Sequence, residues 1–385
     1  TMTFTQLITH TDDQQSVCLT DVKIRDAHSL LIPKQALTMT ETNTNIPTAI
    51  IIGGDPATMW CGLAPLPDKI DPYLLAGWIR GKPVRFAEGI SQPINVPADA
   101  EIIIEGEIDL LSKDSNHDND YIMTVTAITH RNDAVFPVIT AHDRRWLHKA
   151  VERLFMPVMR LILPEVHDMN LPFEYGLHNL ALISINKHYA GQAHKVMHGL
   201  WGMGQLALLK TIIVVDADVD VQQSESVLTH ILDNVDPAGD IMHVHGLRQD
   251  HLTGHRIGDK IGIDATRKPD TIHRDMQLDD DKLSANIIGK YRVYGRFVLV
   301  AKHSETCDVG KIMSTIHGVQ PHAFVIVVDY GTPLDDSHAI ATNILTNVEW
   351  TRDITTHITH GLIGIDATHS KIQQEDRTES YVSKT

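Results

Sequence analysis

The sequence predicts a mixed α/β protein in which a strand-rich part precedes a part where strands and helices alternate. In residues 46–137, short β-branched runs end at glycines, as TAIII at 48–52 ends before Gly53. From Leu180 onward, buried-type strands alternate with helical patterns. Such alternation is typical of a largely parallel sheet covered by helices.

An internal repeat is the third observation behind this fold class. The pair VD at 215–216 recurs at 328–329, and the run GIDAT at 262–266 recurs at 364–368. The two offsets are 113 and 102 residues, so only the connection between the motifs changes in length. Collinear similarity of this kind predicts two successive copies of one α/β unit.

The individual elements follow from local patterns. The first part has further strand patterns and one helical pattern, at 101–105, 121–129, 134–140 and 71–79. A helical apolar period over 144–163 predicts a connecting helix. The alternating part then has strands at 180–185 and 211–216, each followed by a helix.

These patterns divide the chain into six predicted segments. They are a short polar N-terminal segment, a strand-rich domain, a linking helix with its connector, an α/β domain, its second copy and a polar tail. Their bounds are 1–45, 46–143, 144–179, 180–270, 271–371 and 372–385.

Composition excludes several classes of function. A formal net charge of −16 argues against a nucleic-acid partner, because excess carboxylate repels phosphate. Three scattered cysteines, Cys18, Cys61 and Cys307, predict neither a disulfide framework nor a zinc site. No apolar run approaches the roughly 20 residues of a membrane span. With no signal-peptide pattern, the sequence predicts a cytoplasmic protein without a transmembrane segment.

Three blocks in fixed order carry a family resemblance: GGDPAT at 53–58, APLPDKIDPYLLAGWIRG at 64–81 and VPADAEIIIEGEI at 96–108. With INKHYAGQAHKVMHGLW and GDKIGIDATRK further on, they resemble the UbiD family of aromatic-acid decarboxylases, which use prenylated FMN and include 3-polyprenyl-4-hydroxybenzoate carboxy-lyases. The resemblance implies a split β-barrel that cradles flavin, then an α/β C-terminal domain. Longer relatives proposed for menaquinone biosynthesis carry a similar extension, which favours that branch.

The same resemblance shows where this chain departs from the family. Pro72 stands where the family keeps the glutamate that holds a divalent metal, and proline has no donor atom. The acidic loop expected between Glu107 and Tyr121, with both catalytic acids, is missing. Arg25 is wrongly spaced for the catalytic arginine, and Gln35 falls where a histidine ligand is expected. We therefore predict no metal and no intact catalytic set.

Residual cofactor contacts are predicted at Gly62, Ala64 and Pro65. In the family, backbone carbonyls at this place approach the flavin phosphate and a potassium ion, and backbone ligands survive side-chain changes. Without the metal, a dianionic phosphate lacks a compensating cation. The sequence thus predicts that prenylated FMN binds weakly or not at all.

Two acidic features have a functional and a structural interpretation. Asp55, after the Gly-Gly turn, either shapes a phosphate pocket or caps the next helix. Glu101, Glu105 and Glu107 alternate along one strand and either perform acid–base chemistry or hold neighbouring structure. The structural interpretation is favoured in both cases.

Other clusters are weaker signals. His194 and His198, four residues apart on a predicted helix, have a spacing that binds divalent metals, but no third ligand is evident. His243 and His245 alternate on a possible strand. The acids at 216–220 are expected to cap the following helix rather than to bind calcium.

Two functions remain open from the sequence. The first is a non-catalytic or partner-dependent homologue of UbiD carboxy-lyases, because the scaffold does not carry the chemistry without its site. The alternative is an active decarboxylase of ubiquinone or menaquinone biosynthesis with rearranged catalytic groups. In either case the resemblance implies a homo-oligomer, and a full-length UbiD-type chain is the expected partner subunit.

Overall fold

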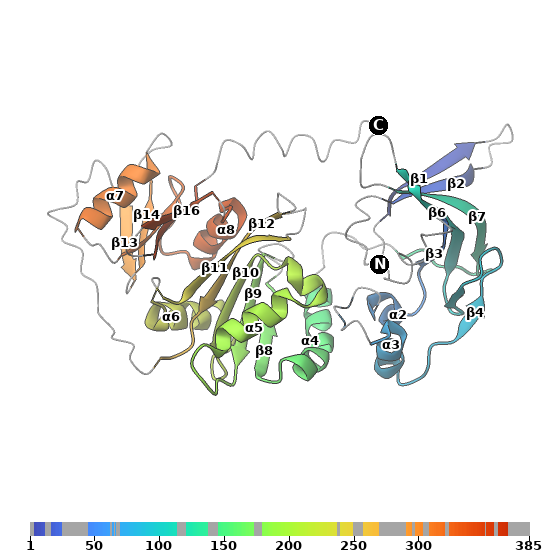
Figure 1. Cartoon of the computed structure of the whole chain (residues 1–385), viewed down its shortest axis with the longest axis horizontal. Coiled ribbons are helices and arrows are strands. Elements are labelled where there is room, and N and C mark those ends of the chain that lie inside the picture. Colours follow the sequence, from blue (N-terminus) through green and yellow to red (C-terminus); the bar gives the residue numbers. More distant parts are fainter. Residues whose placement is uncertain are drawn as a thin grey trace. The chain divides into compact units, whose positions relative to one another are not determined.

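The structure is a computed structural model that describes most of the chain as two compact units, Thr1–His142 and Asp143–Thr385. The described residues are 4–11, 17–24, 45–61, 64, 66, 70–113, 121–137, 145–172, 179–236, 239–248, 257–268, 290–294, 297–302, 308–319, 323–350, 352–357 and 361–368. Each unit has its own sheets and helices (Figure 1).

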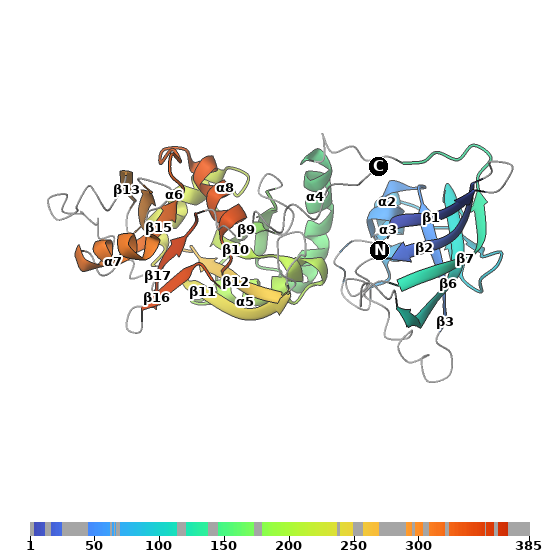
Figure 2. The ribbon, with the colours of Figure 1, turned by 90° about the horizontal axis from the view of Figure 1, so that it is seen from above.

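The first unit is built on a five-stranded antiparallel sheet of order β1-β2-β7-β6-β3. Its strands are β1 (Phe4–Thr11), β2 (Val17–Ile24), β3 (Asn45–Ile52), β6 (Ile102–Lys113) and β7 (Tyr121–His130). Ile50 of β3 pairs with Ile104 of β6, and both are buried. Figure 2 shows β1 and β2, in dark blue, beside β7. β1 and β3 lie at the two ends of this strand order and do not pair with each other among the described residues, so the sheet is not closed there. The split β-barrel therefore remains a prediction.

Residues 1–45, expected as a short polar segment, contribute β1 and β2 to this sheet. The strand predicted at 134–140 is wrong for residues 134–137, which are not in a strand, while 138–140 lie outside the described residues. The predicted helix at 71–79 is α3 (Pro72–Arg80), preceded by the short helix α2 (Pro56–Cys61). A small hairpin, β4 (Phe86–Glu88) with β5 (Asn95–Pro97), completes the unit.

The second unit contains two mixed sheets. The first has the order β11-β12-β10-β9-β8, with β9, β10 and β12 parallel and both edge strands antiparallel. Its strands are β8 (Val166–Asn170), β9 (Leu180–Ile185), β10 (Thr211–Asp216), β11 (Ile241–Arg248) and β12 (Ile257–Asp264). Its helices are α4 (Arg145–Ile162), α5 (Gln192–Trp201), the 3₁₀ turn η5 (Gly204–Leu208) and α6 (Ser224–Asn234). Every residue of β9 is buried, as expected for a central strand covered on both faces.

The second sheet has the order β13-β14-β15-β17-β16 and the same pattern of strand directions. Its strands are β13 (Lys290–Tyr294), β14 (Phe297–Ala301), β15 (Phe324–Val328), β16 (Ile354–His357) and β17 (Gly361–Asp366), with helices α7 (Val309–Val319) and α8 (Ser337–Asn347). We call residues 166–268 the first module and residues 290–368 the second module. Residues 269–289, which connect them, and the polar tail at 372–385 lie outside the described residues.

Positions paired by the sequence repeat make the same contacts in both modules. The backbone N–H of Asp264 donates to the carbonyl of Asp240 at 2.9 Å, and that of Asp366 donates to Asp353 at 2.9 Å. These bonds join the start of one edge strand to the end of its neighbour. The repeated motif thus encodes one local structure twice.

Glycine is repeated where a helix crosses the sheet closely. A Cβ placed on Gly262 would lie 2.5 Å from the sulfur of Met197 in α5. A Cβ on Gly364 would lie 3.1 Å from the sulfur of Met313 in α7 and 2.7 Å from the carbonyl oxygen of Val325. Because most real Cβ contacts are longer, glycine at both positions lets these elements pack without a shift of the neighbouring atoms.

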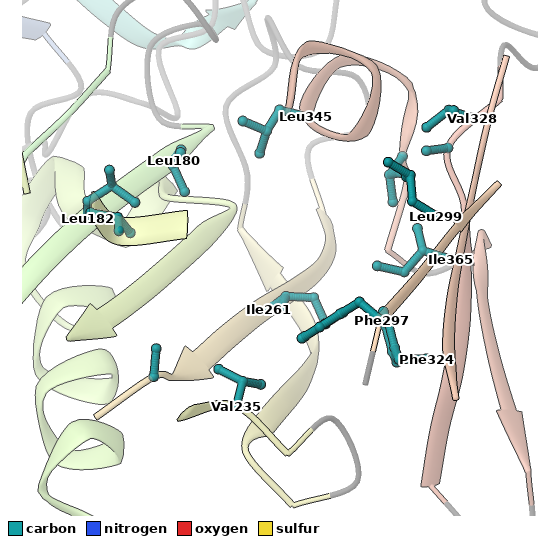
Figure 3. Packing of buried hydrophobic residues seen from close by; sticks show 14 of the residues in the cluster. Leu180, Leu182, Val235, Ile261, Phe297, Leu299, Phe324, Val328, Leu345 and Ile365 are labelled. Carbon is teal, nitrogen blue, oxygen red and sulfur yellow. The ribbon is translucent and has the colours of Figure 1, made fainter. Parts of the chain in front are cut away.

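One apolar cluster joins the two modules. It contains buried residues from both sheets and from α6 and α8, including Leu182, Ile261, Phe297 and Leu345. Figure 3 shows Ile261 of the first module beside Phe297 of the second. The modules therefore share a core, whereas a separate cluster between α7 and its own sheet belongs to the second module alone.

Candidate functional site

The turn from β3 into α2 is the first part of the candidate site. Gly53 and Gly54 have φ of 74° and 113°, which side chains rarely adopt. Asp55 Oδ1 accepts a hydrogen bond from the backbone of Ala57 at 2.9 Å, so the predicted cap is present. At the end of α2, burial and the charge of Asp55 raise the pKa of the Cys61 thiol to about 11. A raised pKa lowers the thiolate fraction of Cys61 at neutral pH and makes it a poor nucleophile.

Arg80 ties this turn to the end of α3. Its Nε lies 2.8 Å from Asp55 Oδ2, and its Nη2 lies 2.7 Å from Asp99 Oδ2. The side chain of Arg80 is only 8% exposed, so the pairing is shielded from solvent. Sequence reasoning missed this residue, because its two acids lie 25 and 19 positions away and share no motif with it.

Pro72 occupies the first turn of α3, where it suits the fixed φ and the absent donor of a helix start. Asp71 caps the same turn by accepting a hydrogen bond from the Tyr73 backbone at 2.8 Å. The helix ends at Gly81, with φ of 67°. The proline that the family resemblance marks as a lost ligand is thus part of a well-formed helix start.

Glu105 is a structural carboxylate, in line with the prediction. Its two oxygens accept hydrogen bonds from the backbone N–H groups of Ile90, Ser91 and Gln92 at 2.7 to 3.0 Å, and from the Ser91 hydroxyl at 3.1 Å. Burial raises the pKa of Glu105, but these bonds outweigh it and hold the pKa below its usual range. A carboxyl group with a lowered pKa is a poor general acid.

The predicted cofactor contacts are only partly described. Gly62 and Pro65 lie outside the described residues. The backbone N–H of Ala64 donates to the carbonyl of Trp60 at 3.1 Å, and its own carbonyl accepts from Leu66 at 2.8 Å. Ala64 therefore sits in a tight local turn, and its role in holding a cofactor stays a prediction.

An open hollow lies on the outer face of α3. Its volume is about 620 Å³, and Tyr73, Leu74, Trp78 and Phe86 contribute apolar surface to it. The rings of Tyr73 and Phe86 meet edge to face, with centroids 4.8 Å apart. Leu74 and Trp78 are 70% and 63% exposed within the chain.

Charged side chains also gather at the carboxyl ends of β10 and β12, where open α/β sheets commonly bind ligands. Asp216 Oδ2 lies 2.9 Å from His230 Nε2 and accepts the backbone N–H of Arg267 at 2.8 Å. Arg267 also forms a bidentate pair with Asp218 at 2.8 and 2.9 Å, and Lys187 donates to the carbonyl of Arg267 at 2.7 Å. The prediction that the acids at 216–220 cap the next helix is wrong, because α6 has Gln223 at its N-cap without a side-chain cap bond. Asp216 and Asp218 pair with these bases instead, and Asp220 accepts the backbone N–H of Gln222 at 2.9 Å.

Among the described residues, one group of three metal-ligating side chains is close enough to share an ion: His243, His245 and Asp259. The helical pair His194 and His198 has no third ligand there. Within the same described ranges, no helix combines the length and apolar character needed to cross a bilayer.

Models of known protein families match residues in both units of the chain. Residues 26–143 match the 3-octaprenyl-4-hydroxybenzoate carboxy-lyase Rift-related domain, and residues 145–265 match the C-terminal domain of the same carboxy-lyase. The chain belongs to the UbiD family. The resemblance seen in the sequence blocks is thereby confirmed, as is the UbiD-like fold.

Two curated relatives of the chain are named as uncharacterized proteins. One from Archaeoglobus fulgidus is 37% identical over 243 residues, covering 58% of this chain and 50% of that protein. One from Helicobacter pylori is 27% identical over 368 residues, covering 87% of this chain and 59% of that protein. The chain spans about half the length of the curated relatives it matches.

Solved structures show a similar fold. Vanillic acid decarboxylase of Sedimentibacter hydroxybenzoicus, in closed form, has a TM-score of 0.57 at 23% identity, covering 69% of this chain and 61% of that one. A UbiD-class enzyme of Pelotomaculum thermopropionicum, in complex with FMN, has a TM-score of 0.50 at 21% identity, covering 73% and 69%. At these identities the likeness concerns the fold alone.

Proposed function

We propose that this chain is a UbiD-family carboxy-lyase homologue that does not decarboxylate by itself and is either non-catalytic or dependent on a partner chain. The observation that carries the proposal is the start of α3. There Pro72, in place of the family's metal-holding glutamate, forms the first helical turn with Asp71 as its cap. A proline side chain offers no oxygen to a divalent cation.

The charges around this turn support the same conclusion. Asp55 and Asp99 are both paired with Arg80, and Asp71 is held by a backbone N–H. Arg80 is in turn neutralised by two carboxylates, so it is a poor counter-ion for a flavin phosphate. The described residues of the first unit therefore do not fit a prenylated flavin clamped by a divalent metal.

The acids that remain in the first unit support a structural role. Glu105 is held by backbone donors, and Glu107 accepts a hydrogen bond from Asn45 at 3.1 Å. Glu101 accepts a hydrogen bond from the backbone of Val135 at 3.1 Å. Each of these three carboxylates holds a neighbouring segment, which favours a structural role over proton transfer.

Cofactor retention tests the proposal. The chain is co-expressed with a prenyl-FMN synthase, purified, and measured for visible flavin absorbance, bound manganese and CO2 release from a panel of aromatic acids. We expect a colourless protein without stoichiometric manganese or activity. The UbiD-class enzyme of Pelotomaculum thermopropionicum, which has been solved in complex with FMN, is prepared in the same way and controls for cofactor supply.

Flavin absorbance with one manganese per chain would overturn the proposal and favour the active decarboxylase of quinone biosynthesis. Analytical ultracentrifugation and pull-down with a full-length UbiD-type protein then separate two forms of the proposal. A stable complex supports a partner subunit, and a homo-oligomer alone supports an independent non-catalytic protein.

A further inference from the structure

Two histidines and an aspartate converge at the free edge of the first module's sheet. β11 is the edge strand, and His243 and His245 lie two residues apart on it, so both point to the same face. Asp259 lies on the neighbouring strand β12. One ligand atom from each of the three lies within 4.8 Å of the others.

A β-bulge brings these side chains together. The register of β11 against β12 shifts between Val244 and Leu247, which places His245 and Gly246 together opposite Asp259. Gly246 adopts a φ of 69°, and its N–H donates to Asp259 Oδ1 at 3.2 Å. The backbone N–H of Gly246 thus holds the Oδ1 side of the carboxylate in place.

Both imidazoles approach this same oxygen. His243 Nε2 lies 2.9 Å and His245 Nδ1 lies 2.8 Å from Asp259 Oδ2. Asp259 is 5% exposed and His243 is 17% exposed, so this contact is largely removed from water. The contact from His243 lacks hydrogen-bond geometry, and its Nε2 is a buried nitrogen without a hydrogen-bond partner among the described residues. A buried polar atom of this kind needs an explanation such as a bound ion.

We propose that His243, His245 and Asp259 bind one divalent first-row transition-metal ion, with Zn²⁺ as the best fit. Two imidazoles and a carboxylate suit Zn²⁺ and its neighbours better than Mg²⁺ or Mn²⁺. Metal–ligand bonds of about 2.0–2.1 Å in a tetrahedral site separate the ligand atoms by roughly 3.3 Å. The two nitrogen–oxygen contacts therefore need to open only slightly, and His245, 73% exposed, is free to adjust.

Three protein ligands leave a fourth tetrahedral position open. Because His245 lies at the solvent-facing side of the group, a water molecule or an external ligand can reach that position. All three ligands belong to the second unit.

The experiment is a metal titration of the full chain. Protein stripped with a chelator is titrated with Zn²⁺ in competition with a chromophoric chelator, and with Co²⁺ while its visible spectrum is recorded. We expect one Zn²⁺ per chain and a Co²⁺ spectrum of four-coordinate type. His245→Ala and Asp259→Asn should each weaken Zn²⁺ binding by about 100-fold or more, since changes that only disturb ligand support already cost ~10–100-fold.

Two variants serve as matched controls. His167→Ala removes an exposed histidine from β8, the opposite edge of the same sheet, and the double variant His194→Ala/His198→Ala removes the helical pair. Neither should change the affinity for Zn²⁺. The proposal is wrong if the native chain binds no stoichiometric Zn²⁺, if His245→Ala binds as tightly as the native chain, or if the helical double variant abolishes binding. Circular dichroism confirms that each variant is folded.

Discussion

The two modules of the second unit have the same strand order but differ at one sheet edge. His245 in the first module corresponds to Ile358 in the second by the 113-residue offset, and Asp259 corresponds to Gly361 by the 102-residue offset. The candidate metal ligands are therefore present in one copy only. The architecture does not need these side chains, which favours a specific role for them in the first module.

The repeated positions, in contrast, are those that the backbone requires. Gly262 and Gly364 admit a helix at close range, and Asp240 and Asp353 each join two strands through a carbonyl. A change at such a position disturbs packing or leaves a backbone group unpaired. The repeated residues are therefore those that the fold requires. The unrepeated candidate ligands, His245 and Asp259, belong to a site that only the first module carries.

The largest expected effect tests whether the modules share one core. Phe297→Ala should lower the free energy of unfolding by about 3–5 kcal/mol, because it opens a cavity in the cluster common to both modules. Hydrogen exchange measured by mass spectrometry should accelerate in β10 and in β14. Ile312→Ala, in the cluster of the second module alone, should accelerate β14 and spare β10. Unchanged exchange in β10 of Phe297→Ala would show two independent cores.

The next largest expected effect is the loss of unfolding free energy on replacing the paired glycines, Gly262 and Gly364. Gly364→Ala should cost about 3 kcal/mol, because its Cβ would meet a backbone oxygen that cannot move aside. Gly262→Ala should cost only about 1 kcal/mol, because the opposing atoms belong to side chains, including the flexible Met197. Urea unfolding of the two variants measures both values. The reverse order would mean that α5 is held more rigidly than α7.

Lys210 forms a polar link between the modules. The repeat does not conserve this lysine, because the 113-residue offset places Ala323 at the corresponding position of the second module. Its ammonium is buried and donates to the carbonyl of Val348 at 2.7 Å, with Glu349 at 3.4 Å. Lys210→Met should cost about 1–2 kcal/mol at neutral pH, because the buried carbonyl loses its donor.

The same variant has a predicted pH dependence. Burial lowers the pKa of Lys210 below its usual 10.5, although Glu349 opposes this effect. Between the two values the unfolded chain holds a proton that the folded chain has released, so native stability gains with rising pH. The deficit of Lys210→Met relative to the native chain should therefore grow toward pH 10.5 in urea titrations. A deficit that shrinks with pH would contradict the burial of an ammonium group.

The smallest effect concerns the repeated threonines. Thr266 and Thr368 each donate their hydroxyl to the aspartate two residues earlier, at 2.5 and 2.7 Å. Thr368→Val should cost about 1 kcal/mol, the usual value of one hydrogen bond. Thr266→Val should cost about 1–2 kcal/mol, because Thr266 Oγ1 also accepts a hydrogen bond from Lys187 Nζ at 2.9 Å. Thermal unfolding curves of the two variants give the comparison. A difference of several kcal/mol between them would show that the two motifs are not equivalent.

Strong local patterns predicted much of the fold. The strands at 180–185 and 211–216 match β9 and β10 residue for residue, and the repeat predicted both sheets of the second unit. The segment 144–179 was expected to be a helix and connector, but it also supplies the edge strand β8, VHDMN. That sequence lacks an apolar run, so only its pairing with β9 makes it a strand.

The candidate sites were less predictable, because they depend on pairing between distant segments. His243 and His245 are visible as a pattern, but Asp259 joins them only through the bulged register of β11 and β12. Arg80 and Asp99 likewise meet through tertiary structure. The loss proposed at Pro72, in contrast, rests on the sequence, because that position lies within a family motif.

The bulge at Gly246 also bears on how the chain behaves at high concentration. A regular edge strand presents an unbroken row of backbone donors and acceptors, onto which a strand of another molecule can add. The extra residue in β11 bends that row and turns the N–H of Gly246 toward Asp259. The distortion that gathers the histidines therefore also makes this edge a poor template for aggregation.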